Sequence, residues 1–129
     1  MRFAKAVFWI AGTWGVLVLV PLYFTFDAVG RQTPPPITHP EYYYGFVGVA
    51  LAWQVAFFVI GSDPLRFRPM MLPAMLEKFG HVATMTTLYL HGRMNLTQLV
   101  FNMPDLILGV LFVIAFVNAR NAGGETRAR

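Results

Sequence analysis

The chain has 129 residues, of which 57% are hydrophobic and only 12% are charged, whereas an ordinary soluble domain has about 25% charged residues. This composition predicts a membrane protein of one domain, with no separate soluble domain. Because the sequence contains no cysteine, it excludes disulfides, thiol nucleophiles and cysteine-ligated metal or iron–sulfur sites. The net charge of +4 does not indicate a nucleic-acid partner, since the basic residues flank hydrophobic segments and are interpreted as determinants of membrane topology.

Four apolar segments are long enough to cross a bilayer, at residues 3–26, 42–61, 69–91 and 99–117. The first follows Arg2 and Lys5 as a secretory signal would, but it is too long and lacks a cleavage site, so we expect a retained helix. Residues 118–129 have no apolar periodicity and are predicted to form a disordered tail.

A loop is predicted between the first two spans, at residues 27–41, because this stretch is rich in glycine and proline. The three prolines at 34–36 favour a stiff, extended segment. We interpret this segment as a rigid connector, and a lid across the mouth of a small bundle is the alternative.

The distribution of basic residues predicts the orientation of the spans. One side of the membrane would hold Arg2, Lys5, Arg66, Arg68, Arg120, Arg127 and Arg129, and the other side Arg31 and Arg93. Both termini should therefore be cytoplasmic. With short links between consecutive spans, the expected fold is an all-α, up-down-up-down four-helix bundle in the inner membrane of a bacterial cell.

The third apolar segment is unusual because it contains Glu77, Lys78 and His81. At 100° per residue, Glu77, His81 and Thr84 fall on one side of a helix. An ionisable side chain in a spanning helix costs about 2.5 to 3.5 kcal/mol on insertion scales, so these groups should face protein or water rather than lipid.

Matching depths predict partners for these groups on the neighbouring spans. Counted from the cytoplasmic end at about 1.5 Å per residue, Glu77 and Gln54 lie about 12 and 10 Å deep, and His81 and Asp105 about 18 and 21 Å. We therefore expect Gln54 to meet Glu77, and His81 to meet Asp105. Such pairing would satisfy buried polar groups whether its role is structural or functional.

Each candidate also has a simpler interpretation. Asp105 resembles a residue of a helix start, with Asn102 as the cap and Pro104 in the first turn, and the alternatives are a buried partner for His81 or Lys78 and a catalytic role. Lys78 would reach the cytoplasmic face with its long side chain. A metal site at His81 is not expected because no second histidine follows at four-residue spacing.

The third and fourth spans, with LEKFG, then His81, Gly92 and Arg93, and then PDLILGVLFVIAF, resemble small four-helix bacterial membrane proteins, broadly the DoxX-like group. The resemblance lies in the four-span layout and the charged third helix, and it implies no active-site residues. Some DoxX-like proteins are associated with quinone-linked redox complexes, so the resemblance brings a quinone into consideration. No other cofactor is predicted.

The sequence thus predicts a polar site inside the membrane, with Glu77, His81, Asp105, Gln54, Lys78 and Thr84 as candidate ligand-binding or proton-relay residues. The expected ligand is an amphiphile, either a lipid or a quinone. Alternatively, the same polar residues form the surface by which the chain docks into a larger membrane complex. The alternatives are a proton-coupled transporter that works as a homo-oligomer and a purely structural subunit. No catalytic residue is assigned, since the sequence supplies no nucleophile constellation or phosphate loop.

Overall fold

A computed structural model of the chain describes residues 2–129, and these residues form helices and connecting turns. The helices are α1 (Arg2–Leu19), α2 (Phe26–Gln32), α3 (Pro40–Ser62), α4 (Met71–Leu90), α5 (Leu96–Phe101) and α6 (Pro104–Ala128), with 3₁₀ turns at Val20–Tyr23 and Arg68–Met70. The expectation of an all-α chain is confirmed.

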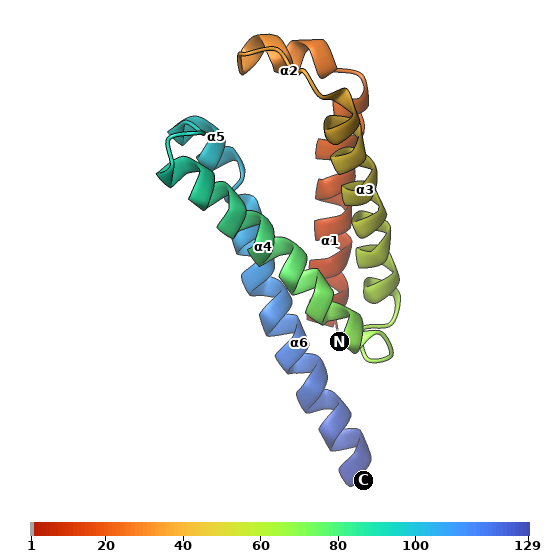
Figure 1. Cartoon of the computed structure of the whole chain (residues 1–129). Coiled ribbons are helices and arrows are strands. Elements are labelled where there is room, and N and C mark those ends of the chain that lie inside the picture. The colour runs from red at the N-terminus through yellow and green to blue at the C-terminus, as the bar shows by residue number, and fades with distance from the viewer. Residues whose placement is uncertain (1) are drawn as a thin grey trace.

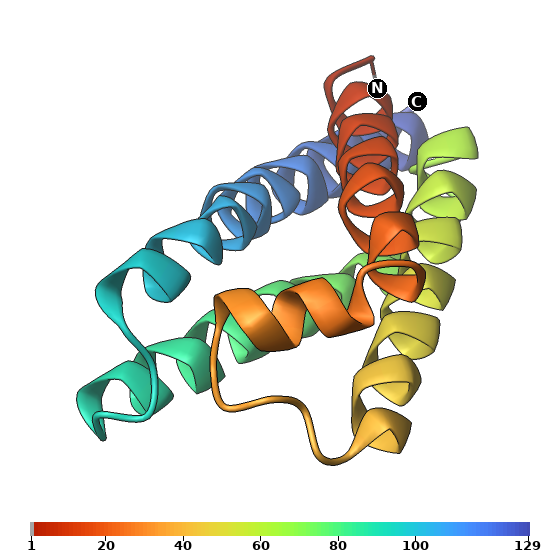
Figure 2. The same cartoon turned by 90° about the horizontal axis from the view of Figure 1, so that it is seen from above.

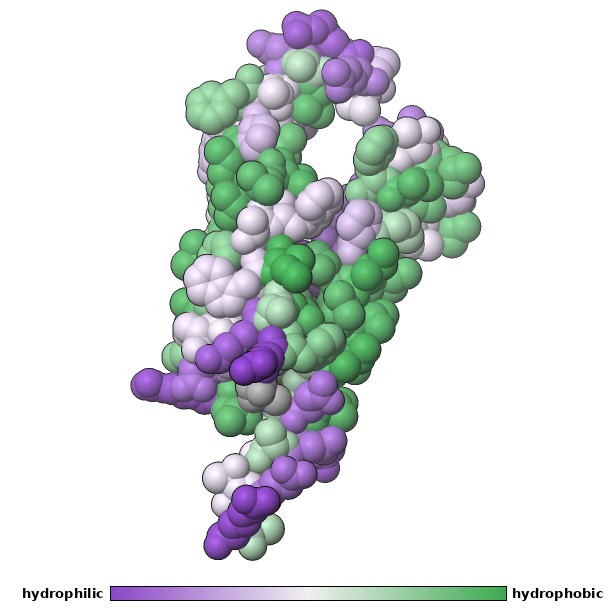
Figure 3. All heavy atoms as spheres, turned by 180° about the vertical axis from the view of Figure 1, so that it is seen from behind, coloured by the Kyte–Doolittle hydropathy of each residue, from purple (hydrophilic) through white to green (hydrophobic). Residues whose placement is uncertain are grey.

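Within residues 2–129, three helical segments are long and apolar enough to cross a membrane: Arg2–Tyr23, Pro40–Ser62 and Leu96–Ala128. Large apolar side chains are also exposed along these segments, such as Leu17, which is 67% exposed, and Ile107, which is 64% exposed. On one face of the molecule, hydrophobic side chains cover the middle and hydrophilic side chains gather at both ends (Figure 3). These features indicate a multi-pass membrane protein.

The four long helices are arranged as two pairs, with α1 beside α3 and α4 beside α6 (Figure 1). The two pairs are in contact at the end that holds the N-terminus and splay apart toward the other end (Figure 1). At the closed end, stacked rings join three of the helices: Phe8 and Phe112 lie 4.3 Å apart between ring centroids, and Phe57 meets Phe112 edge to face at 5.1 Å. This aromatic core therefore holds the pairs together, and the splay leaves room between them at the other end.

Helix α2 corrects the prediction of a loop over residues 27–41. It spans Phe26–Gln32, and only the remainder of that stretch, up to α3, is irregular. Asp27 in its first turn and Arg31 in its last turn suit the helix dipole, a local signal that the glycine and proline content obscured. Helix α2 extends from the top of α1 across the open end, above the gap between the two pairs (Figures 1 and 2).

The C-terminal region differs from the prediction in two ways. The expected span at 99–117 is divided into α5 and α6. Asn95 and Gln98 form a reciprocal capping box that starts α5, and Pro104 starts α6 after a break of two residues. The tail predicted to be disordered from residue 118 continues α6 through Ala128. Ala119 is buried against the core and anchors this extension, since a helix once formed propagates at little cost.

Candidate functional site

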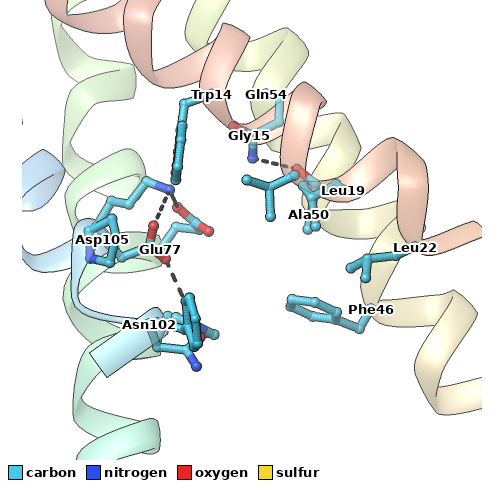
Figure 4. A pocket seen from close by; sticks show the side chains of 15 residues that line it. Trp14, Gly15, Leu19, Leu22, Phe46, Ala50, Gln54, Glu77, Asn102 and Asp105 are labelled. Atoms are coloured by element: carbon cyan, nitrogen blue, oxygen red, sulfur yellow. Dashed lines mark hydrogen bonds and ion pairs between the residues drawn. The ribbon is translucent and has the colours of Figure 1, made fainter. Parts of the chain in front are cut away.

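A cavity of about 390 Å³ lies between the two helix pairs, on the open side of the aromatic core. Its lining comes from every long helix and consists of Trp14, Gly15, Val18, Leu19, Leu22, Phe46, Ala50, Gln54, Glu77, Lys78, His81, Phe101, Asn102, Pro104 and Asp105. The polar residues Glu77, Asn102 and Asp105 stand on one side, and Leu19, Leu22, Phe46 and Ala50 stand on the other (Figure 4). The cavity thus has an ionic wall made by α4 and α6 and an apolar wall made by α1 and α3.

Lys78 is the centre of the ionic wall. Its side chain is buried, with the residue only 4% exposed, and its Nζ donates to Asp105 Oδ1 at 3.2 Å. Glu77 Oε2 forms an ion pair with the same Nζ at 3.4 Å. Two carboxyl groups therefore share one ammonium group.

His81 extends the ionic wall by one turn of α4. Its Nε2 lies 2.8 Å from Asn102 Oδ1 and 3.9 Å from Asp105 Oδ2. Asn102 is held in place because its Nδ2 donates to the carbonyl of Gln98 at 2.8 Å. A continuous series of polar contacts therefore runs from Glu77 through Lys78 and Asp105 to His81 and Asn102.

Gln54 is the polar group of the opposite wall. It is 2% exposed, and its Nε2 donates to the carbonyl of Ala50 at 2.8 Å. Its Oε1 lies against α1 at Gly15, where an added Cβ would overlap it, and finds no hydrogen-bond partner within residues 2–129. Glycine at position 15 is therefore what lets this amide fit between α1 and α3.

Two contacts join the walls at the borders of the cavity. Lys78 Nζ lies 5.1 Å from the ring centroid of Phe57 on α3, a cation–π contact. The rings of Phe46 and His81 face each other with centroids 6.3 Å apart and planes within 15°. The space is thus bordered by one charged contact and by one pair of facing rings.

Of the residues predicted from the sequence, Glu77, Lys78, His81, Asp105 and Gln54 all line this cavity. Thr84 does not line it, and its hydroxyl donates to the carbonyl of Gly80 on its own helix. The prediction that Lys78 reaches the cytoplasmic face is wrong: Asp105 and Glu77 draw its ammonium group inward.

The predicted partners are altered in detail. His81 and Asp105 approach each other, but Asn102 is the nearer partner of His81. Gln54 bonds to its own helix rather than to Glu77, so the two residues face the same space from opposite walls. Asn102 makes no capping bond at the start of α6, whereas Pro104 and Asp105 do occupy its first turn as expected.

Sequence reasoning did not assign Asn102 or Trp14 to the site. Asn102 had been interpreted as a helix cap, and Trp14 lies in a span whose apolar pattern carries no sign of a cavity. Within residues 2–129, no group of three or more histidine or acidic side chains is placed to hold a metal ion.

In comparisons with protein-family models, curated proteins and solved structures, nothing matches this chain. Membership of the DoxX-like group therefore stays a prediction from the resemblance alone.

Proposed function

We propose that this chain is a four-span protein of the bacterial inner membrane whose cavity binds the head of an amphiphile, a lipid or a quinone-type molecule. The observation that carries the proposal is the two-sided cavity, with ionic groups around the buried Lys78 on one wall and mostly apolar side chains on the other. Ligand sites of this kind orient a molecule with a few convergent polar groups while apolar walls take up the rest. The DoxX-like resemblance is compatible with such a ligand.

In this proposal α4 also crosses the membrane, as the third of four spans, although it is less apolar than the other three. Its charged residues face the cavity, whereas Leu72 and Leu76, which are 53% and 72% exposed, would face lipid. The segments that carry the basic residues assigned to the cytoplasmic side then lie at the end that holds both chain termini, as an up-down-up-down bundle requires (Figure 1).

Reporter fusions test this topology. A fusion after Arg129 should report the cytoplasm, and one placed at the prolines 34–36 should report the opposite side. Two fusions that report the same side would contradict the four-span arrangement without bearing on the cavity itself.

The site favours a head group that donates hydrogen bonds. Gln54 Oε1 is a buried acceptor that lacks a hydrogen-bond partner among the described residues, and Gln54 lines the cavity opposite the carboxylates of Glu77 and Asp105. An unpaired buried acceptor costs about 1 to 3 kcal/mol, which a ligand hydroxyl or ammonium group would recover. We therefore expect a hydroxylated or amine-bearing amphiphile, for example a quinol rather than a quinone.

The test is to purify the full chain from membranes and identify co-purifying lipids and quinones by mass spectrometry. Gln54→Met removes the unpaired acceptor with little change in side-chain length and should lower ligand retention while the protein stays folded. Thr87→Val is the matched control, since the Thr87 hydroxyl bonds to the carbonyl of Ala83 on the same helix, away from the cavity. Equal retention by both variants, or no enriched amphiphile in the wild type, would contradict the proposal.

A proton relay is the second candidate function, and the contact series from Glu77 to Asn102 favours it. Such a relay would move protons across a reconstituted bilayer in an oligomer. Proton flux that His81→Leu abolishes, in protein that carries no amphiphile, would select the relay. If the chain retains no amphiphile, shows no proton flux and purifies with a partner complex, it would instead be a docking or structural subunit.

A further inference from the structure

A second hollow, of about 550 Å³, lies at the end of the molecule that holds the C-terminus, away from the cavity between the helix pairs. Its lining is Leu65, Arg68, Ala119, Arg120, Gly123, Gly124, Thr126 and Arg127. Three arginines therefore meet in one hollow, and no acidic side chain of the described residues belongs to its lining.

The arginines come from two elements that are distant in sequence. Arg120 and Arg127 are seven residues apart on α6, so they share one face of the helix, and Arg68 approaches from the 3₁₀ turn before α4. The Arg68 guanidinium lies 4.4 Å from the ring centroid of Phe116. Its Nε is buried and has no hydrogen-bond partner among residues 2–129. This N–H donor is therefore unpaired within the described part of the chain.

The hollow also has open space between its charges. Gly123 and Gly124 fall between Arg120 and Arg127 on the same face of α6, and a Cβ added at either glycine would meet no atom within 4 Å. A group of several atoms can therefore lie against this part of the helix. Thr126 also lines the hollow, and its hydroxyl donates to the carbonyl of Ala122.

We propose that this hollow binds a phosphate-bearing anion. Guanidinium groups present N–H donors in a planar fork that matches phosphate oxygens, and this hollow is lined by three of them with no acidic side chain among its lining residues. The hollow lies at a hydrophilic end of the molecule, next to the apolar middle (Figure 3). In a membrane this is the level of anionic lipid head groups, although a soluble phosphate could supply the same chemistry.

The test uses the full chain in a zwitterionic detergent and measures bound lipid by native mass spectrometry, with phosphatidylglycerol, phosphatidylcholine and inorganic phosphate as probes. Arg120→Gln with Arg127→Gln removes two lining charges at exposed helix positions, where folding should be unaffected. Arg66→Gln with Arg129→Gln is the control, because it removes the same charge from the same end outside the hollow. Arg68→Gln tests the buried donor, with thermal stability measured alongside.

We expect phosphatidylglycerol to bind more tightly than phosphatidylcholine, and the Arg120/Arg127 variant to weaken it about 25-fold, since each basic group near a head group contributes about fivefold. The control should change binding less than about twofold by the same reasoning. Competition by inorganic phosphate would assign the site to soluble phosphates, and its absence would assign it to lipid. Equal losses in both double variants, or equal binding of the two lipids together with no effect of inorganic phosphate, would overturn the proposal.

Discussion

The contact between α1 and α3 differs in chemistry from the contact between α4 and α6. Between α1 and α3 the contact is close and mostly apolar, with Gly12 against Phe58, Gly15 against Gln54, and Gly61 against Trp9. Between α4 and α6, Gly109 also allows a close approach, but the contact continues into the ion pairs of Lys78 beside the cavity. Close apolar packing suits a scaffold, whereas buried ion pairs carry a desolvation cost that apolar residues of the same size would avoid. The comparison indicates that the α1–α3 pair supports the site and that the α4–α6 pair carries its chemistry.

The largest expected effect is at Lys78. Lys78→Met leaves the partly buried carboxylates of Glu77 and Asp105 without their shared cation, so we expect a loss of about 3 to 5 kcal/mol in the free energy of unfolding. Unfolding by SDS in mixed micelles measures it.

A triple variant sharpens this prediction. Lys78→Met combined with Glu77→Gln and Asp105→Asn removes all three charges and should recover most of the lost stability, because apolar or neutral replacements of a complete ionic group are often tolerated. If Lys78→Met alone unfolds as the wild type does, the ion pairs do not connect α4 to α6.

The next effect is at Gly15, on the apolar wall. Gly15→Ala places a methyl group where Gln54 Oε1 lies, so α1 and α3 must separate or the amide must move, at a cost of about 1 to 3 kcal/mol. Thermal unfolding in detergent measures the loss.

Gly45→Ala is the matched control, since an added Cβ there meets no atom within 4 Å and alanine favours the helix. In a protein that already carries Gln54→Ala, Gly15→Ala should cost little stability, because the amide that it would displace is gone. A Gly15→Ala protein as stable as the Gly45→Ala protein would show that the close packing of this pair is not needed.

The smallest effect is expected at His81. His81→Leu removes the contact with Asn102 and should cost about 0.5 to 1.5 kcal/mol. The measurement is a double-mutant cycle with Asn102→Leu, in which the paired substitutions should cost less than the sum of the single ones. Strict additivity would mean that the two side chains act independently.

Several features of this protein were predictable because they depend only on local sequence. The length of the apolar segments and the low content of charged residues predicted long apolar helices, and three of them are confirmed as long and apolar enough to span a membrane. The 100° periodicity placed Glu77 and His81 on one side of α4, because the direction of a side chain is set by its own helix. Depth matching brought Asp105 near His81, since rise per residue is also a local property.

Tertiary structure decided the rest. Lys78 turns inward because Gly109 lets α6 approach its Cβ, so that Asp105 comes within hydrogen-bonding distance, and such an approach cannot be inferred from α4 alone. Asn102 became the partner of His81 because α5 and α6 divide at residues 102–103, which frees its amide from the capping role predicted for it. The cavity exists because the aromatic core closes only one end of the two pairs. That splay is a property of how four helices pack together, and no single segment of the sequence encodes it.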